Sequence, residues 1–137
     1  MATPVGYSGT PLWKKLGLAP GLRLCVIGAP ADYDALIAGA PAPIERVARP
    51  GAGVGLVHLF VEQRADLSRQ LPRLREQLRA DAVLWVSWPK KASKRPTDIT
   101  EDVIRELALP IGWVDVKVCA VDAVWSGLKL VVREELR

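Results

Sequence analysis

The sequence predicts a Rossmann-like α/β fold: a three-layer, mostly parallel sheet of about six strands that ends in an antiparallel hairpin. Two observations predict it. Apolar runs of strand length alternate with segments of helical spacing along most of the 137 residues, and two alternating segments joined by a short turn follow. A chain of this length is expected to form one hydrophobic core, so residues 1–137 are predicted to be a single domain.

The chain is predicted to start with a leader, residues 1–20, that contains one short helix. The step Thr10-Pro11-Leu12-Trp13 predicts the start of this helix, because proline is tolerated in a first turn, and Gly17 is expected to end it. Residues 22–28 then form a near-continuous apolar run, which favours a strand that is covered on both faces.

The next segment predicts a short helix followed by two strands. Asp32 is expected to cap the helix, which begins at Tyr33. Strands are predicted at residues 44–48 and 54–61, on either side of a Pro-Gly breaker.

A longer helix is predicted over residues 63–80, because leucines recur there at helical spacing. Asp66 is a candidate cap for its first half, and Pro72 should kink it or begin a second half. Residues 82–88 follow as the most strand-like segment of the chain and are expected to lie centrally.

The end of the chain predicts a basic loop, a helix and a hairpin. Thr97, Asp98 and Thr100 are candidate caps for the helix. The turn of the hairpin is expected at residues 122–127. The first strand of the hairpin is expected to direct Val114, Val116, Val118 and Ala120 to one face of the sheet, with Asp115, Lys117 and Cys119 on the other.

Composition excludes several classes of function. No apolar run approaches the roughly 20 residues of a membrane span, and the N-terminus does not resemble a secretory signal, so we expect a cytoplasmic protein without membrane partners. The net charge of +4 is mild and fits a small anionic ligand or an acidic protein partner. Arginines between Arg64 and Arg79 are expected on an outer helix face, and without an RNA-binding signature or a helix-turn-helix pattern nucleic acid is not an expected partner.

Cysteine and histidine are too few for a metal site or a disulfide framework, so no metal is expected. Cys25 and Cys119 lie in strand-like segments and are expected to be small buried hydrophobic residues. His58 is the only histidine, and we expect it to be partly buried and structural.

Ligands in open parallel sheets bind outside the carboxyl ends of the strands, near the point where the strand order reverses. Applied to the predicted topology, this rule selects the strand ends Gly28-Ala29-Pro30, Glu62-Gln63-Arg64 and Ser87–Lys91, which are expected to converge on one edge. The hairpin turn adds residues whose side chains could stack on or orient a ligand. The candidate ligand-binding residues are Gly28, Ala29, Pro30, Ser87, Trp88, Lys90, Lys91, Lys94, Asp122, Trp125 and Ser126.

Each group of candidates has two interpretations. The lysines, with the adjacent Arg95, are either an anion clamp or a solvated basic loop. The tryptophans either stack on a planar ligand or close the core. Asp122 and Ser126 either orient a ligand or form the turn. No nucleophile with an adjacent base is present in the pattern, so no catalytic residue is assigned.

Four distinctive segments are Gly6–Leu12, Trp85–Lys91, Lys117–Asp122 and Trp125–Leu128. They resemble a bacterial family known only as domain of unknown function 3052, and the resemblance covers nearly the whole chain. The family has no established activity, so the resemblance implies a bacterial protein and no particular reaction.

The order of elements is also similar to class I S-adenosylmethionine-dependent methyltransferases, whose sheets finish with a strand, a helix and an antiparallel hairpin. This chain resembles a shortened version that lacks one outer strand-helix unit. Such proteins usually have several glycines after the first strand and a carboxylate at the end of the second. This sequence has one glycine in Gly28-Ala29-Pro30-Ala31, and Glu45 lies near the start of the second strand. The resemblance implies S-adenosylmethionine as cofactor, whereas the residues by themselves assign none.

Two functions from different classes follow from these observations. The first is a non-catalytic binding module for an anionic or nucleotide-like ligand or a protein partner, which would use the loops after Gly28, Trp88 and Val121. The alternative is a minimal S-adenosylmethionine-dependent methyltransferase. A third interpretation is a subunit whose exposed sheet edge pairs with a second copy as a homo-oligomer.

Overall fold

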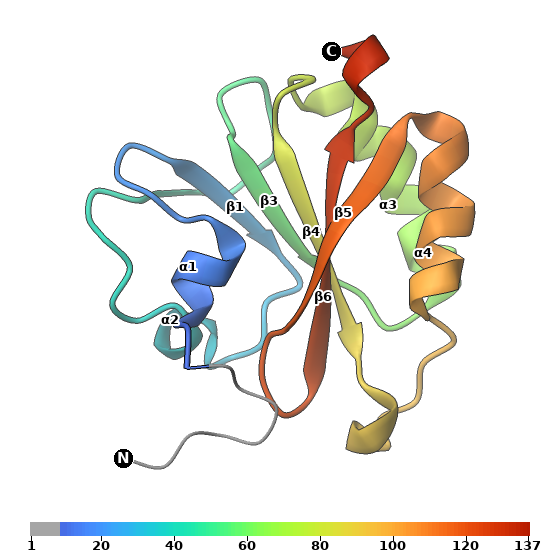
Figure 1. The fold of residues 1–137 in the computed structure, drawn as a ribbon, viewed down its shortest axis with the longest axis horizontal. Coiled ribbons are helices and arrows are strands. Elements are labelled where there is room, and N and C mark those ends of the chain that lie inside the picture. The colour runs from blue at the N-terminus through green and yellow to red at the C-terminus, as the bar shows by residue number, and fades with distance from the viewer. Residues whose placement is uncertain (1–8) are drawn as a thin grey trace.

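The computed structural model describes residues 9–137, so the start of the predicted leader lies outside the described residues. One six-stranded sheet forms the centre of the molecule (Figure 1). Its strands are β1 (Arg23–Ile27), β2 (Glu45–Val47), β3 (Leu56–Phe60), β4 (Val83–Pro89), β5 (Trp113–Ala120) and β6 (Trp125–Val132). The helices are α1 (Leu12–Leu16), α2 (Tyr33–Leu36), α3 (Arg64–Gln77) and α4 (Glu101–Ala108), with 3-10 turns at Lys91–Ser93, Leu109–Ile111 and Glu134–Leu136. Within this part of the chain no helix is long and apolar enough to cross a membrane.

The strand order is β2-β1-β3-β4-β6-β5. β1 to β4 run parallel, β6 is antiparallel to β4, and β5 is antiparallel to β6. The predicted mostly parallel sheet with a terminal hairpin is therefore confirmed. The strand order reverses at β1, which has β2 on one side and β3 on the other, so the carboxyl ends of β1 and β3 meet at the lower edge of the sheet in Figure 1.

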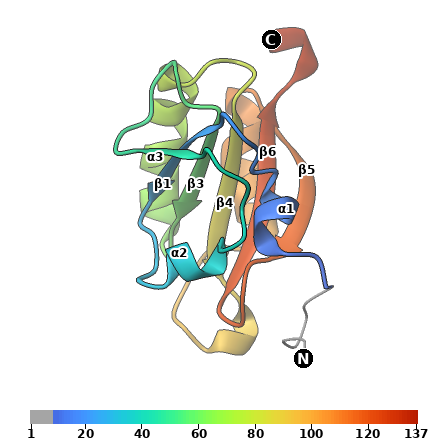
Figure 2. The same ribbon diagram turned by 90° about the vertical axis from the view of Figure 1, so that its left-hand side faces the viewer.

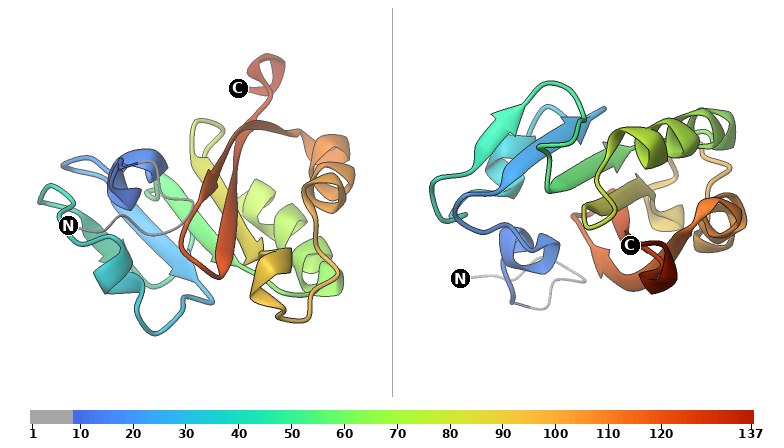
Figure 3. Two further views of the ribbon diagram at one scale, coloured as in Figure 1. Left: turned by 60° about the horizontal axis from the view of Figure 1, so that its bottom comes forward. Right: turned by 90° about the horizontal axis from the view of Figure 1, so that it is seen from above.

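Helices cover both faces of the sheet (Figures 2 and 3). α3 and α4 pack on one face, and the buried free thiol of Cys25 lies in this cluster, as predicted. α1 and α2 pack on the other face with Leu12, Leu16 and Tyr33. The indole N–H of the fully buried Trp85 donates to the carbonyl oxygen of Leu16 at 3.0 Å, which satisfies the polar atom of this aromatic ring and anchors α1 to the sheet.

The predicted caps of α2 and α4 have different outcomes. Asp32 occupies the position before α2, but its side chain makes no cap hydrogen bond, so that prediction is wrong. A usual N-cap residue has an extended backbone, whereas the backbone at Asp32 is not extended. Thr100 does cap α4, because its hydroxyl oxygen accepts from the backbone N–H of Val103 at 3.2 Å.

The cap of α3 comes from a distant loop instead of from Asp66. The Asp98 carboxylate accepts a hydrogen bond from the backbone N–H of Arg64, the first residue of the helix, at 2.6 Å. Asp66 lies within the first turn and pairs with Arg69. The helix continues through Pro72 as one element, so of the two predicted alternatives the start of a second half does not occur, and a kink stays a prediction.

A β-bulge changes the predicted alternation in β5. Asp115 pairs with Leu130, whereas Lys117 pairs with Lys129, so Val116 is the extra residue. Because Leu130 and Lys129 point to opposite faces of β6, Asp115 and Lys117 also lie on opposite faces. The prediction that they share a face is wrong, since a bulge is set by pairing between strands that local alternation does not record.

Candidate functional site

A cavity of about 860 Å³ opens at the carboxyl ends of β1 and β3, where the strand order reverses. We call it the switch-point pocket. Its volume lies within the range of small-molecule sites, roughly 300–1,000 Å³. It is lined by residues 28–31 after β1, by residues 60–63 at the end of β3, by Ala65, Asp66 and Arg69 of α3, by Arg95 and Pro96 before α4, and by Trp125 of β6.

Gly28 forms the floor of the pocket between β1 and β3. Its φ of +70° is a left-handed conformation that favours glycine. A Cβ atom at this position would lie 2.7 Å from the carbonyl oxygen of Phe60, which is closer than van der Waals contact allows. The single glycine of the loop is therefore required by the fold, and it lets backbone line the cavity without a side chain.

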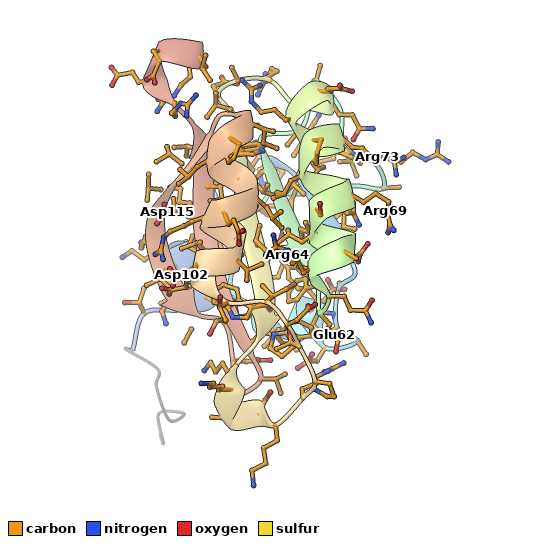
Figure 4. All side chains as sticks on the ribbon, turned by 90° about the vertical axis from the view of Figure 1, so that its right-hand side faces the viewer. Glu62, Arg64, Arg69, Arg73, Asp102 and Asp115 are labelled. Atoms are coloured by element: carbon orange, nitrogen blue, oxygen red, sulfur yellow. The ribbon has the colours of Figure 1, made fainter. Side chains whose placement is uncertain are left out.

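Charged groups of both signs lie at the mouth of the pocket. The Arg95 guanidinium pairs with the Glu62 carboxylate at 3.0 Å and lies 5.1 Å from the centre of the Trp125 ring. Asp66 and Arg69 form a second pair on α3. Figure 4 shows Glu62 beside the start of α3 and Arg69 on the side of the helix that is turned away from α4. A ligand with both an anionic and a cationic group would find partners for each here.

The loop that carries Arg95 is tied to the start of α3. The Thr97 hydroxyl donates to the carbonyl oxygen of Glu62 at 2.7 Å, and Asp98 accepts from the backbone N–H of Arg64. Two hydrogen bonds therefore fix the loop between β4 and α4 against the end of β3, which holds Arg95 over the pocket.

A buried polar network lies beneath the pocket. His58 is fully buried, with Nδ1 2.9 Å from the Tyr33 hydroxyl and Nε2 2.7 Å from the Ser87 hydroxyl. Burial lowers the pKa of His58 to about 3, so the imidazole is neutral, with one donor and one acceptor nitrogen that the two hydroxyls satisfy. The ring stacks on Phe60, with centroids 4.3 Å apart, and so supports a residue of the pocket wall. The structural role predicted for His58 is therefore supported, but it is fully and not partly buried.

Ser87 acts in this network and does not reach the pocket. We expect Ser87→Ala to lower the free energy of unfolding by about 1–3 kcal/mol, because a buried nitrogen of His58 loses its partner. Urea denaturation measures this change. Because Ser87 does not line the pocket, the affinity for any ligand bound there should stay within about twofold of wild type. Unchanged stability together with an affinity at least about tenfold lower would instead show that Ser87 contacts that ligand.

Four of the predicted ligand-binding residues line the pocket: Gly28, Ala29, Pro30 and Trp125. Trp88 is 7% exposed and belongs to the core cluster under α3 and α4, so core closure is the interpretation that the structure favours. None of these residues is a nucleophile or a base.

The predicted lysine clamp is not assembled at this pocket. Lys90, Lys91 and Lys94 are absent from its lining, and Lys91 and Lys94 are exposed. Of the basic residues in this loop, Arg95 is the one that lines the cavity. The sequence shows that these charges lie in the loop after β4. Which of them faces the pocket depends on the hydrogen bonds of Thr97 and Asp98, which hold the loop in place.

The hairpin turn positions Trp125 through Asp122. One Asp122 carboxylate oxygen accepts from the backbone N–H groups of Val124 and Trp125 at 2.8 and 2.7 Å. These hydrogen bonds support the interpretation that Asp122 forms the turn. Ser126 pairs with Trp88 between β4 and β6, outside the pocket lining.

Several residues of the pocket were not among the predicted ligand-binding residues. Phe60 and Arg69 were not predicted at the site, whereas Glu62 was expected only at the converging end of its strand and Arg95 only as part of the lysine clamp. The signal for Phe60 and Glu62 is their place at the carboxyl end of a parallel strand next to the switch point. Arg69 has no such signal, because only the packing of α3 brings it there.

No family model and no curated protein matches the chain, but solved structures share its fold. A LepI variant in complex with SAH and a substrate analogue aligns with TM-score 0.58 and 14% identity, over 97% of this chain and 49% of LepI. A protein described as a type 11 methyltransferase from Sulfolobus solfataricus aligns with TM-score 0.58 and 10% identity, over 81% of this chain and 84% of that one. Fibrillarin from Aeropyrum pernix, with natively bound S-adenosyl-L-methionine, aligns with TM-score 0.59 and 12% identity, over 92% of this chain and 70% of fibrillarin.

These neighbours are class I S-adenosylmethionine-dependent methyltransferases in fold, and at such identities the likeness shows the fold alone. It confirms the predicted methyltransferase-like topology that lacks one outer strand-helix unit. The chain spans about half the length of LepI. No family model supports the resemblance to domain of unknown function 3052, which stays a prediction.

Proposed function

We propose that the protein binds S-adenosylmethionine in the switch-point pocket. The observation that carries this proposal is the position of the cavity, outside the carboxyl ends of β1 and β3 at the reversal of strand order, where open α/β sheets bind their ligands. Neighbours of the same fold crystallised with SAM or SAH support it. They favour the methyltransferase alternative over a non-catalytic module for some other anion.

The charged residues of the pocket fit the amino-acid end of S-adenosylmethionine. This end carries a carboxylate and an ammonium group next to a sulfonium. Arg95 and Arg69 can pair with the carboxylate, and Glu62 and Asp66 can pair with the positive groups. In the described structure these four side chains pair with one another, so the ligand would exchange existing ion pairs for new ones.

The ribose is the part of S-adenosylmethionine that the pocket fits least well. The carboxylate that usually holds it ends the second strand, but Glu45 begins β2 and pairs with Arg23 at 2.6 Å. Pro30 also lacks an N–H to offer. We therefore expect an affinity weaker than that of a site with such a carboxylate, and a smaller preference for ribose over deoxyribose.

Methyl transfer is a second candidate function, favoured by the fold of the neighbours. Bound S-adenosylmethionine would supply an electrophilic methyl group. Glu62 and Asp66 are the pocket residues able to accept a proton from a methyl acceptor. Incubation with isotope-labelled S-adenosylmethionine and cell extract tests this function, and binding without transfer would leave the non-catalytic module.

Calorimetric titration with S-adenosylmethionine, SAH and ATP tests the binding proposal. We expect saturable binding of the first two compounds and affinity at least about tenfold lower for Arg95→Ala, because a charge-assisted hydrogen bond is lost. Lys91→Ala is the matched control, since it removes an exposed positive charge from the same loop outside the pocket. Absence of binding, or equal losses in both variants, would refute the proposal.

A further inference from the structure

A second cavity, of about 530 Å³, lies between α1 and the edge strand β5. It is lined by Thr10, Lys14 and Lys15 from α1 and the residues before it, and by residues 117–120 of β5. We call it the α1–β5 pocket. Among the described residues, none lines both this pocket and the switch-point pocket. Figure 2 faces the side of the sheet on which α1 lies against β5 and β6.

Positive charge is concentrated at the α1–β5 pocket without a compensating carboxylate in its described lining. Lys117 and Lys129 are direct cross-strand neighbours in β5 and β6, an arrangement in which like charges repel. Burial raises the pKa of the Cys119 thiol, and the nearby Lys15, Lys117 and Lys90 act in the opposite direction. Of these three lysines, Lys15 and Lys117 line the same pocket as Cys119.

Lysine and arginine are used differently in this molecule. Each ion pair found among the described residues joins a carboxylate to an arginine, and neither Lys14 nor Lys117 takes part in one. Solvated lysines scattered over a surface would be unremarkable. Three lysines line this one concave site, and one of them, Lys117, lies directly across from Lys129 just outside the lining, so a bound anion would relieve a repulsion there.

We propose that the α1–β5 pocket binds a compact polyanion of the di- or triphosphate class, through Lys14, Lys15 and Lys117. Lysine is a common phosphate ligand because its ammonium group acts as a mobile point charge. The size of the cavity suits a small molecule. The described residues of its lining include no aromatic side chain on which a nucleic-acid base could stack, so among these residues the chemistry favours a small phosphate compound over a single-stranded nucleic acid.

Calorimetric titration of the full chain with inorganic tripolyphosphate tests this proposal. We expect saturable binding that weakens as salt is raised, and affinity at least about tenfold lower for the double variant Lys14→Gln/Lys117→Gln. Lys91→Gln/Lys94→Gln is the matched control, because it removes two exposed charges from a loop outside this pocket. The control should keep wild-type affinity within about twofold; equal losses would show that only net charge matters and would overturn the proposal.

Two further measurements distinguish phosphate binding at this pocket from a loss of folding and from binding at the switch-point pocket. Lys117→Gln should not lower the thermal midpoint of the ligand-free protein, since it removes a repulsion, but it should reduce the increase in midpoint that tripolyphosphate produces. Arg95→Ala should leave tripolyphosphate binding unchanged, which keeps this result independent of the switch-point pocket. Tighter binding of a single-stranded oligonucleotide than of tripolyphosphate, lost in the double variant, would show a nucleic-acid interface and contradict the assignment.

Discussion

The free energy of unfolding is expected to fall by about 2 kcal/mol when the pH is lowered from about 7 to about 5, with His58 as the cause. The pKa of this buried imidazole is lowered from 6.5 to about 3 in the folded protein. Between these values the unfolded chain binds a proton that the folded chain excludes. The contribution of His58 to stability is therefore complete above pH 6.5 and is lost as the pH falls towards about 3.

Urea denaturation at several pH values measures this effect. The slope should approach about 1.4 kcal/mol per pH unit at the acidic end of the window, the maximum for one proton. His58 is the only histidine, and carboxylates titrate mainly below pH 5, so the window from about 5 to 6.5 belongs to this residue. His58→Gln keeps a polar side chain that cannot titrate, and its stability should be nearly independent of pH there. A slope that persists in this variant would assign the effect to another group.

The substitution Gly28→Val is expected to lower the free energy of unfolding by about 3 kcal/mol or more. A β-branched residue strongly resists the positive φ, and its Cβ would meet the Phe60 carbonyl oxygen. The strands β1 and β3 would have to separate at the floor of the switch-point pocket. Gly28→Ala carries the same clash with a smaller side chain, and we expect a loss of about 2 kcal/mol or more.

Gly21→Ala is the matched control for the Gly28 variants. Gly21 also has a positive φ, of +88°, but within residues 9–137 no atom beyond its chain neighbours lies within 4 Å of an added Cβ. This control therefore measures backbone strain alone, about 1–2 kcal/mol. Chemical denaturation of the variants gives the difference, which is the contribution of the close approach between β1 and β3. Equal stabilities of Gly28→Ala and Gly21→Ala would contradict the described geometry of the pocket floor.

The sequence was sufficient to predict features that depend on local patterns. The leucine spacing of α3 and the apolar run of β4 each follow from residues adjacent in the chain, so the order of elements and the parallel sheet could be predicted. Features that depend on distant partners were missed. The cap of α3 comes from Asp98, 34 residues away, and the bulge at Val116 depends on register with β6.

In the candidate site, too, residues at the ends of predicted elements could be predicted, whereas residues placed by distant partners could not. Gly28 was predicted because it follows a strand that ends at the switch point, and Trp125 because it lies near the hairpin turn and could stack on a planar ligand. Selecting Arg95 in place of the neighbouring lysines required the tethers that direct the loop, and these join residues more than thirty positions apart. The His58 network joins residues from α2, β3 and β4, so only the assembled sheet reveals that its imidazole is satisfied and neutral.

Titration of ¹⁵N-labelled protein with S-adenosylmethionine, followed by amide NMR shifts, tests the proposed binding site most directly. We expect saturable shifts concentrated at Gly28, Ala29, Glu62, Gln63 and Arg95, around the switch-point pocket. Residues of the α1–β5 pocket, such as Lys14 and Lys117, should remain unchanged. Absence of saturable shifts, or shifts centred away from the carboxyl ends of β1 and β3, would contradict binding at the switch-point pocket.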